Sequence, residues 1–357
     1  MIKVAKFGGS SCASAEQFRK VKDIVLSDKS RHYIVVSAPG KRASGDTKVT
    51  DLLYRLQDAV ADEKKFQETL QTIKDRYQEI IDGLELQFSL AADFDRIEQD
   101  LKAGADRDYA ASRGEFLNAK LMAAYLGFSF IDSASCFVFK EDRSCDYQKT
   151  EEGIRAALKD IDYAVFPGFY GANEKGEVVT FSRGGSDVTG SLIAAAEHVD
   201  LYENWTDVSG FLVADPRIVP NPEVIDYITY RELRELSYMG AGVLHEDAIF
   251  PVRREGIPIQ IKNTNRPEDH GTLIVQNTLK KPRFIITGVS GKKDFCAINI
   301  EKAMMNSEIG FARKLLSVLE DNNISFEHIP SGIDTMTLVI HQEELEHCEQ
   351  KILNGIQ

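Results

Sequence analysis

The chain has 357 residues, of which 43% are hydrophobic and 28% are charged, and its formal net charge is -13. This balance is typical of a soluble globular protein, and the length predicts two or three domains. The negative charge argues against nucleic acid or an anionic membrane as a partner. The sequence contains no run of about 18 apolar residues, so no membrane span is predicted. Five scattered cysteines form no metal-binding pattern, which indicates free thiols in a reducing cytoplasm.

The predicted elements alternate between strands and helices. In chain order they are a strand at 1–8, an amphipathic helix at 15–27, a buried strand at 33–38, helix almost throughout 50–126 except around Gly104, strands at 128–131, 164–169 and 178–181, a helix at 187–198 and a strand at 273–275. This alternation predicts an α/β domain with a largely parallel sheet.

The segment after Pro282 shows a different order of elements. It is predicted to contain strands at 284–289 and 296–300, a helix at 310–322, strands at 325–328 and 337–341, and a helix at 343–353. This βαββα-type order indicates a separate α+β domain. We therefore divide the chain into residues 1–282 and residues 283–357.

A paired-glycine turn, KFGGSS at residues 6–11, follows the first predicted strand. Glycines let backbone N–H groups approach a phosphate closely, and Ser11 or Ser14 can cap the next helix, whose N-terminus favours anions. Lys6 can stabilise charge on a phosphoryl group in transfer. The alternative is a tight turn with a surface lysine. The spacing matches neither a Walker A loop nor a dinucleotide GxGxxG motif.

A second glycine turn, FSRGGSDVTG at residues 181–190, also leads from a strand into a helix. Arg183 is suited to bidentate binding of a carboxylate. Asp187 is explained equally well as a helix N-cap. Two such turns predict two anion sites that face each other at one edge of the sheet, beyond the carboxyl ends of its strands.

Two further segments carry polar groups. TDVSG at 206–210 and ADPR at 214–217 can contact a nucleotide or a metal-bound phosphate, although turn formation explains them as well. SRGE at 112–115 lies in helical sequence, where glycine costs about 1 kcal/mol relative to alanine and needs a reason such as close packing or a bend. Glu115 either meets an amino group or lies on a solvated helix face.

The ordered set of segments resembles the aspartate kinase family. KFGGSS, RGE, SRGGSDVTG, TDVSG and ADPR occur in the order and spacing of that family, as do residues 239–252 and 258–274. The resemblance covers residues 1–275 and implies a three-layer α/β/α amino-acid kinase fold with a mainly parallel sheet. The tail resembles an ACT domain, a ferredoxin-like module that binds an amino-acid effector.

The resemblance implies transfer of the γ-phosphate of ATP, with Mg²⁺, to the β-carboxylate of L-aspartate, the first step of lysine, threonine and methionine biosynthesis. Lys6 would stabilise the phosphoryl group and Asp187 would position Lys6, while Arg183 would bind the α-carboxylate and Glu115 the ammonium of aspartate. The remaining implied site residues are Thr50 and Ser186 for the substrate, and Gly8, Gly9, Ser10, Thr206, Asp207, Asp215 and Arg217, together with Lys6, for ATP. The attacking group is already a carboxylate, so no general base is needed.

Three features depart from the family pattern. Leu212 stands where the family often has tyrosine, and Gly242 stands where it often has lysine, both on the nucleotide side. The family usually carries two interleaved ACT units, whereas this sequence has about one. We therefore expect either that the sequence is a piece of a longer chain or that its regulation is unusual.

The ACT resemblance also implies an effector, lysine or threonine. The implied contacts are Ser307, Gly310, Phe311, Ser325 and Glu327. Such modules commonly pair between chains, so we expect a homodimer or larger homo-oligomer; the alternative is an α+β addition that only dimerises. No metal site built from protein side chains is predicted.

Two other functions remain open on the sequence. Another amino-acid kinase, such as glutamate 5-kinase, would share the fold and take a different acceptor, although RGE together with SRGGSD favours aspartate. A catalytically dead amino-acid sensor would keep only the ACT surface. Intact Lys6, Arg183 and Asp187 argue against the sensor.

Overall fold

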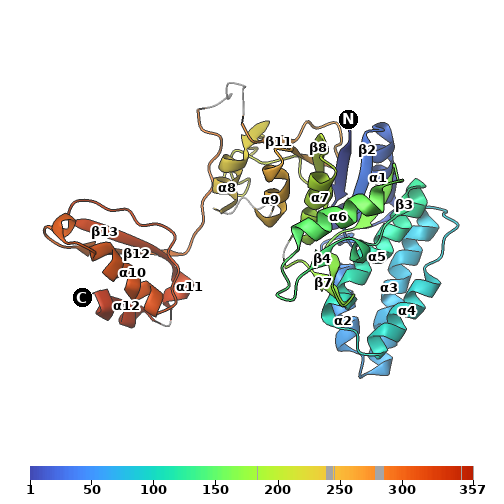
Figure 1. The fold of residues 1–357 in the computed structure, drawn as a ribbon, viewed down its shortest axis with the longest axis horizontal. Helices are drawn as coiled ribbons and strands as arrows, with labels where there is room; N and C mark the ends of the chain where they lie inside the picture. Colours follow the sequence, from blue (N-terminus) through green and yellow to red (C-terminus); the bar gives the residue numbers. More distant parts are fainter. Residues whose placement is uncertain (183, 239–243, 245, 278–284, 347, 357) are drawn as a thin grey trace. The chain divides into compact units, whose positions relative to one another are not determined.

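The computed structural model describes residues 1–182, 184–238, 244, 246–277, 285–346 and 348–356 (Figure 1). The contacts within the chain divide it into two compact units, Met1–Ser290 and Gly291–Gln357. The predicted domain boundary at residue 282 falls outside the described residues.

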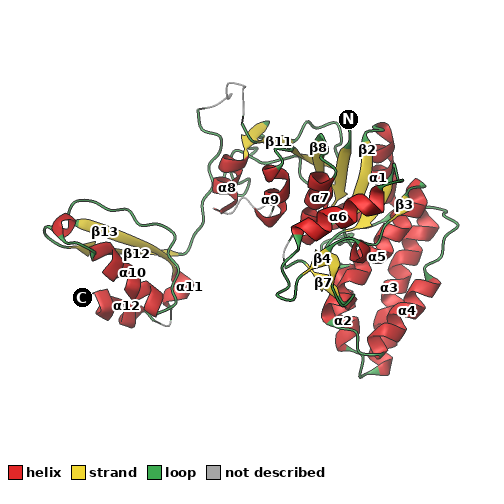
Figure 2. Cartoon of the chain, in the orientation of Figure 1, coloured by secondary structure: helices red, strands yellow, loops and turns green. Residues whose placement is uncertain are grey.

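Unit 1 is built on an eight-stranded sheet with the strand order β3-β5-β2-β1-β8-β10-β11-β9 (Figure 2). The strands from β3 through β10 in that order run parallel, whereas β11 is antiparallel to β10, so the prediction of a mainly parallel sheet is confirmed. The strands are β1 (Lys3–Phe7), β2 (Arg31–Val36), β3 (Ser129–Phe130), β5 (Ala164–Pro167), β8 (Leu201–Thr206), β9 (Tyr227–Thr229), β10 (Ile259–Asn263) and β11 (Thr272–Val275). A separate three-stranded sheet contains β4 (Val138–Phe139), β6 (Tyr170–Asn173) and β7 (Val178–Thr180).

Helices cover both faces of the large sheet, which gives three layers (Figure 2). One layer contains α1 (Ala15–Ser27), α2 (Val49–Asp58), α3 (Glu63–Gly83), α4 (Ala91–Lys102) and α5 (Arg107–Leu126). The other contains α6 (Tyr147–Leu158), α7 (Gly185–Ala196), α8 (Tyr230–Tyr238) and α9 (Glu246–Arg254). Each layer shares a hydrophobic core with one face of the sheet, so the expected three-layer α/β/α architecture is confirmed.

The alternation of side chains along β1 decides where its lysine points. Ala5 and Phe7 belong to the core under α1 and α5, whereas Val4 belongs to the core under α7. Successive side chains of a strand point to opposite faces, so Lys6 lies on the same face as Val4. The side chain of Lys6, near the end of β1, therefore points toward the helical layer that contains α7.

The region 50–126 contains more breaks than predicted. Four helices replace the nearly continuous helix, with interruptions at 59–62 and 84–90 in addition to the expected one near Gly104. Two of the helix starts are fixed by capping: the side chain of Asp62 accepts a hydrogen bond from Lys65 N, and that of Asp106 accepts one from Tyr109 N. An aspartate before each of these helices is a sequence signal for an N-cap, and it could have been used to predict the two helix starts.

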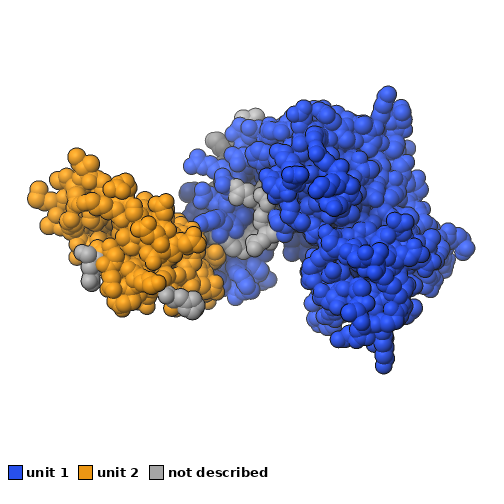
Figure 3. Space-filling view, turned by 60° about the horizontal axis from the view of Figure 1, so that its bottom comes forward, with its two compact units in different colours: residues 1–290 blue, residues 291–357 orange. Residues whose placement is uncertain are grey.

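Unit 2 is the smaller of the two units (Figure 3). It has an α+β fold and its own hydrophobic core. It contains the antiparallel pair β12 (Phe295–Glu301) and β13 (Thr335–His341), and the helices α10 (Phe311–Asp321), α11 (Gln342–Leu345) and α12 (Glu349–Ile356). Its core gathers apolar side chains from both strands and all three helices, among them Leu315, Leu319, Leu338, Ile340, Leu345 and Ile352. The predicted helix at 343–353 is therefore two short helices.

Two strands predicted around unit 2 are wrong. Residues 325–328 form no regular strand, although Glu327 N donates to the carbonyl oxygen of Val339 and Val339 N donates to that of His328. Pro330 follows shortly and has no N–H to continue a ladder. Residues 285–289 are irregular as well, with the side chains of Ile285 and Ile286 exposed, so this apolar run finds no core to bury it.

Candidate functional site

The centre of the candidate site is a buried ion pair between β1 and α7. Lys6 Nζ lies 2.5 Å from Asp187 Oδ1, and both side chains are mostly buried. Asn204 of β8 completes the group, since its Nδ2 donates to Asp187 Oδ1 at 2.9 Å and its Oδ1 accepts from Lys6 Nζ at 3.4 Å. Asn204 is the register partner of Lys6 in the parallel pair β1–β8, so it lies on the same sheet face. Asn204 was not predicted as a site residue. The signal available for it is its position within a strand.

The N-terminus of α7 supplies the carboxylate of this pair. Gly184, in the left-handed region with φ 57°, is the N-cap, and Asp187 lies in the first helical turn. The alternative interpretation of Asp187 as an N-cap is therefore wrong. The expected placement of both glycine turns at one sheet edge also needs correction, because β7, which precedes the second turn, belongs to the three-stranded sheet. The α7 helix, rather than a shared sheet, brings Asp187 to Lys6.

The first glycine turn closes directly on the sheet and on a second loop. Gly8 N donates to the carbonyl oxygen of Trp205 at 3.0 Å, and Gly40 N donates to that of Gly9 at 2.8 Å. A Cβ on Gly9 would lie 2.9 Å from the carbonyl oxygen of Ala38, so the backbones approach too closely for a side chain. Ser10 follows in a short 3-10 helix, Gly9–Cys12.

The next helix, α1, is capped by Ser14 rather than Ser11. The side chain of Ser14 accepts a hydrogen bond from Gln17 N. Ser11 Oγ lies instead 2.7 Å from Thr264 Oγ1, in a buried contact that joins the turn to the end of β10. Thr264 was not predicted as a site residue.

Two serines meet where the substrate was expected. Ser37, directly after β2, has its Oγ 2.9 Å from Ser186 Oγ in the first turn of α7. The Nδ2 atom of Asn118 donates to the carbonyl oxygen of Ser37 at 2.6 Å and so fixes this strand end to α5. A Cβ on Gly168 would lie 2.4 Å from Ser186 Oγ. Ser186 was predicted, whereas Ser37 and Asn118 were missed; a serine at the end of an apolar run was the only signal for Ser37.

Glu115 is buried on α5 and does not lie on a solvated face. Its Oε2 atom has no hydrogen-bond partner among the described residues, and burial raises the pKa of its carboxyl to about 8. Gly114 beside it allows close packing, because a Cβ there would lie 2.7 Å from Ala38 Cβ and 3.2 Å from Leu53 Cδ1. Thr50, in the first turn of α2, follows Val49, which also packs against Gly114.

The residues predicted on the nucleotide side fall into two places. Thr206 ends β8, at the same edge of the sheet as Lys6, and its Oγ1 donates to Asp207 Oδ1 at 3.2 Å. Asp215 and Arg217 lie in an exposed loop and pair with each other, which lowers the pKa of the Asp215 carboxyl to about 2 through the hydrogen bond from Arg217.

A polar network fixes the loop after β8. Asn263, the register partner of Thr206 on β10, donates through Nδ2 to the carbonyl oxygen of Asp207 at 3.3 Å and to Ser209 Oγ at 2.9 Å. Ser209 Oγ donates in turn to Asp269 Oδ2 at 2.5 Å. Among the positions of interest, Arg183 and Gly242 fall outside the described residues, while Leu212 forms an isolated bridge with Val224.

The predicted effector residues divide between the two ends of α10. Ser307, Gly310 and Phe311 precede or begin the helix, whereas Ser325 follows its end and donates through its N–H to Glu344 Oε2. At about 1.5 Å per residue, α10 spans roughly 16 Å. Within one unit the structure therefore does not bring the two groups together; Glu327 lies with the second group, beside β13.

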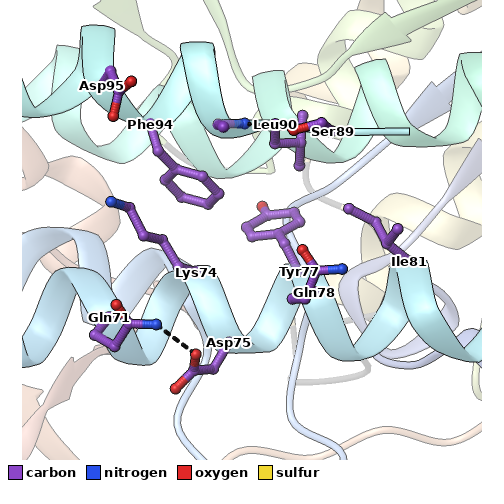
Figure 4. A pocket seen from close by; sticks show the side chains of 11 residues that line it. Gln71, Lys74, Asp75, Tyr77, Gln78, Ile81, Ser89, Leu90, Phe94 and Asp95 are labelled. Carbon is purple, nitrogen blue, oxygen red and sulfur yellow. Dashed lines mark hydrogen bonds between the residues drawn. The ribbon is translucent and has the colours of Figure 1, made fainter. Parts of the chain in front are cut away.

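The described residues also give information on disulfides, membrane-spanning helices, metal-binding clusters and pockets. All five cysteines are free, as predicted. None of the described helices combines the length and the apolar character that a membrane span requires. The described part of the chain holds no cluster of three or more metal-ligating His, Cys, Asp or Glu side chains. A surface hollow between α3 and α4, around Tyr77 and Phe94, includes none of the predicted site residues (Figure 4).

The chain is similar to several known proteins. Residues 1–263 match the amino acid kinase family. Aspartokinase 3 of Bacillus subtilis is 40% identical over 98% of this chain and 80% of its own length. The crystal structure of Clostridium acetobutylicum aspartate kinase has a TM-score of 0.89 and 52% identity, covering 99% of this chain and 81% of that one.

A more distant relative has been solved with ligands. The structure of E. coli aspartokinase III in complex with aspartate and ADP has a TM-score of 0.75 and 25% identity, covering 96% of this chain and 79% of that one. The same enzyme in complex with lysine and aspartate has a TM-score of 0.72 and covers 99% of this chain and 83% of that one. Taken with the family match and the 40% identity to the Bacillus protein, these likenesses show that the chain belongs to the amino acid kinase family and, within it, to the aspartokinases.

Proposed function

We propose that this chain is an aspartate kinase, which transfers the γ-phosphate of ATP to the β-carboxylate of L-aspartate. The observation that carries the proposal is the buried Lys6–Asp187 pair of 2.5 Å beside a glycine turn, in a chain that resembles aspartokinases over almost all of its length. A fixed cation at the end of a strand suits stabilisation of a phosphoryl group in transfer.

The reaction needs positioning and charge stabilisation rather than proton transfer. A carboxylate oxygen of aspartate attacks the γ-phosphorus, the bond from that phosphorus to the bridging β,γ-oxygen breaks, and ADP leaves with the electron pair. Lys6 stabilises the negative charge on the transferring oxygens, while Asp187 and Asn204 hold the ammonium in place. The product is 4-phospho-L-aspartate, an acyl phosphate.

The acceptor is bound by groups from both helical layers. Glu115 offers a buried carboxyl oxygen that has no hydrogen-bond partner in the part of the chain that the structure describes, and such an oxygen is suited to the substrate ammonium. Ser186 and the newly identified Ser37 offer hydroxyls at the ends of β2 and α7. Thr50 and Arg183 complete the proposed set, with Arg183 assigned to the α-carboxylate.

The donor is bound along the other strand ends. Gly9 and Ser10 present backbone N–H groups to the phosphates, while Gly8, whose N–H is bound to the carbonyl oxygen of Trp205, fixes the start of the turn. Thr206 and Asp207 extend the site toward the nucleoside. Asp215 and Arg217 belong to the same proposed set, in an exposed loop. Mg²⁺ would bind together with the phosphates of ATP and would supply charge neutralisation there.

Regulation and assembly belong to unit 2 in this proposal. An amino-acid effector, lysine or threonine, binds the ACT-like unit; a relative, E. coli aspartokinase III, has been solved in complex with lysine and aspartate. Because the two predicted contact groups lie at opposite ends of α10, an effector that touches both requires a second copy of the unit. We therefore propose a homodimer or larger homo-oligomer.

An acceptor panel tests the proposed function. The purified chain with ATP, Mg²⁺ and hydroxylamine should form a hydroxamate with L-aspartate and none with L-glutamate. Turnover on glutamate alone would favour glutamate 5-kinase. Amino-acid binding without turnover on either acceptor would favour the sensor.

A further inference from the structure

Arg76 is a buried cation far along the chain from every residue assigned above to phosphate binding. It lies on α3, and only 5% of its surface is exposed. Its Nη1 lies 2.5 Å from Asp46 Oδ2 and its Nη2 donates to the carbonyl oxygen of Gly40 at 2.9 Å. Its buried Nε has no hydrogen-bond partner within the described part of the chain. Burial of a guanidinium is costly unless it is paired, so both contacts are needed to keep it there.

Both partners of Arg76 belong to residues 40–48, the segment between β2 and α2. Asp46 also accepts hydrogen bonds from the backbone N and the Nε of Arg42, at 3.0 and 2.9 Å. Arg42 Nη1 lies 2.5 Å from Glu79 Oε2, one helical turn after Arg76 on α3. The segment is thus attached to α3 at two successive turns.

Gly40 connects this attachment to the phosphate-binding turn, which we define as Gly8–Ser10. Its carbonyl oxygen accepts from Arg76, whereas its N–H donates to the carbonyl oxygen of Gly9 at 2.8 Å. A Cβ on Gly40 would lie 2.7 Å from Gly9 C and 2.9 Å from Ser10 N, so the two backbones are in direct contact. A shift of Gly40 therefore moves the turn.

The helix that carries Arg76 is itself fixed near the acceptor side. The ring of Tyr77 packs edge-on against Phe94, with the ring centroids 6.0 Å apart (Figure 4). The Tyr77 hydroxyl donates to the carbonyl oxygen of Gly114 at 2.7 Å, next to Glu115. Neighbouring residues of α3 thus contact both sides of the proposed site.

We propose that Arg76 is a positioning residue for the kinase reaction: through Gly40 it holds the turn Gly8–Ser10 in the geometry that binds the phosphates of ATP. The inference rests on the proposed function, and it adds a residue of the outer helical layer to the machinery. A structural role alone would affect stability and leave the affinity for ATP unchanged.

Steady-state kinetics of Arg76→Lys and Arg76→Met test the inference in the full chain. The lysine keeps the charge and loses the second donor, so we expect the KM for ATP to rise about fivefold or more in both variants. The KM for aspartate should change less than twofold. Arg96→Ala is the matched control, because Arg96 makes a single exposed ion pair with Asp100 on α4.

The KM for ATP in the folded variants decides whether Arg76 is a positioning residue. An unchanged KM for ATP in folded Arg76→Lys overturns it, and so does a lowered melting temperature with no change in that KM. If both Arg76 variants fail to fold, Asp46→Asn takes their place, because loss of the ion pair that fixes the guanidinium should loosen its contact with Gly40. A raised KM for ATP in this variant supports the inference, and an unchanged one overturns it. An inactive wild-type chain would instead refute the proposed function.

Discussion

At the level of single residues, the proposed reaction depends on a few buried charges. Lys6, Asp187 and Asn204 form a closed group whose three members come from β1, α7 and β8. Opposite charges held at 2.5 Å in a mostly buried place keep a fixed orientation, which is what stabilisation of a transferring phosphoryl group requires. Glu115 differs, because its carboxyl is buried without a cation at hydrogen-bond distance among the described residues.

Removal of the Lys6 ammonium should affect turnover far more than folding. For Lys6→Ala we expect kcat to fall about 10²–10³-fold, because the charge is needed mainly in the transition state. Steady-state kinetics with circular dichroism measures this. Lys64→Ala, on an exposed position of α3, is the control and should behave as the wild type. Near-normal turnover in Lys6→Ala would refute its role.

The raised pKa of Glu115 predicts a pH profile. A carboxyl with a pKa of about 8 is protonated at pH 7, and only its ionised form binds the substrate ammonium well. The value of kcat/KM for aspartate, which reports the free enzyme, should therefore rise between pH 7 and pH 9 with a midpoint near 8. Glu115→Gln should remove this rise and lower kcat/KM. A wild-type profile that is flat over this range would contradict the assignment.

At the scale of elements, the glycine turn works because two segments approach it at backbone distance. Gly40→Ala places a Cβ 2.7 Å from Gly9 C, and backbone atoms cannot give way cheaply. We expect the KM for ATP to rise about tenfold, which corresponds to about 1.4 kcal/mol of lost binding. Gly45→Ala is the matched control on the same segment, since a Cβ there meets nothing within 4 Å. Equal behaviour of the two variants in kinetics would contradict this view.

Local sequence patterns predicted the helices and strands better than the long-range contacts between them. The helix at Ala15–Ser27 and the parallel strands followed from periodicity and apolar runs. The approach of Asp187 to Lys6 was predicted only through family resemblance, because the two residues lie far apart in the sequence and no local rule encodes that contact. Arg76 and Asn118 carried no signal, since a charged or amide residue on a helix usually faces solvent.

At the scale of the whole molecule, the two units have separate cores and separate proposed tasks. The residues assigned to the reaction lie in unit 1, and those assigned to the effector lie in unit 2. Leu338→Ala, in the core of unit 2, should cost about 2–5 kcal/mol and lower one of two calorimetric transitions. Activity without effector should stay unchanged. Leu70→Ala in unit 1 should move the other transition, and one shared transition would contradict independent units.

The proposed reaction requires that the carboxylate of aspartate, rather than water, attacks the γ-phosphorus. Aspartate labelled with ¹⁸O in its β-carboxylate, incubated with ATP, Mg²⁺ and hydroxylamine, tests it directly, because trapping of the acyl phosphate releases the bridging oxygen with phosphate. We predict one ¹⁸O atom in each phosphate released. Phosphate without label would mean that the chain only hydrolyses ATP, and would refute the proposed transfer to aspartate.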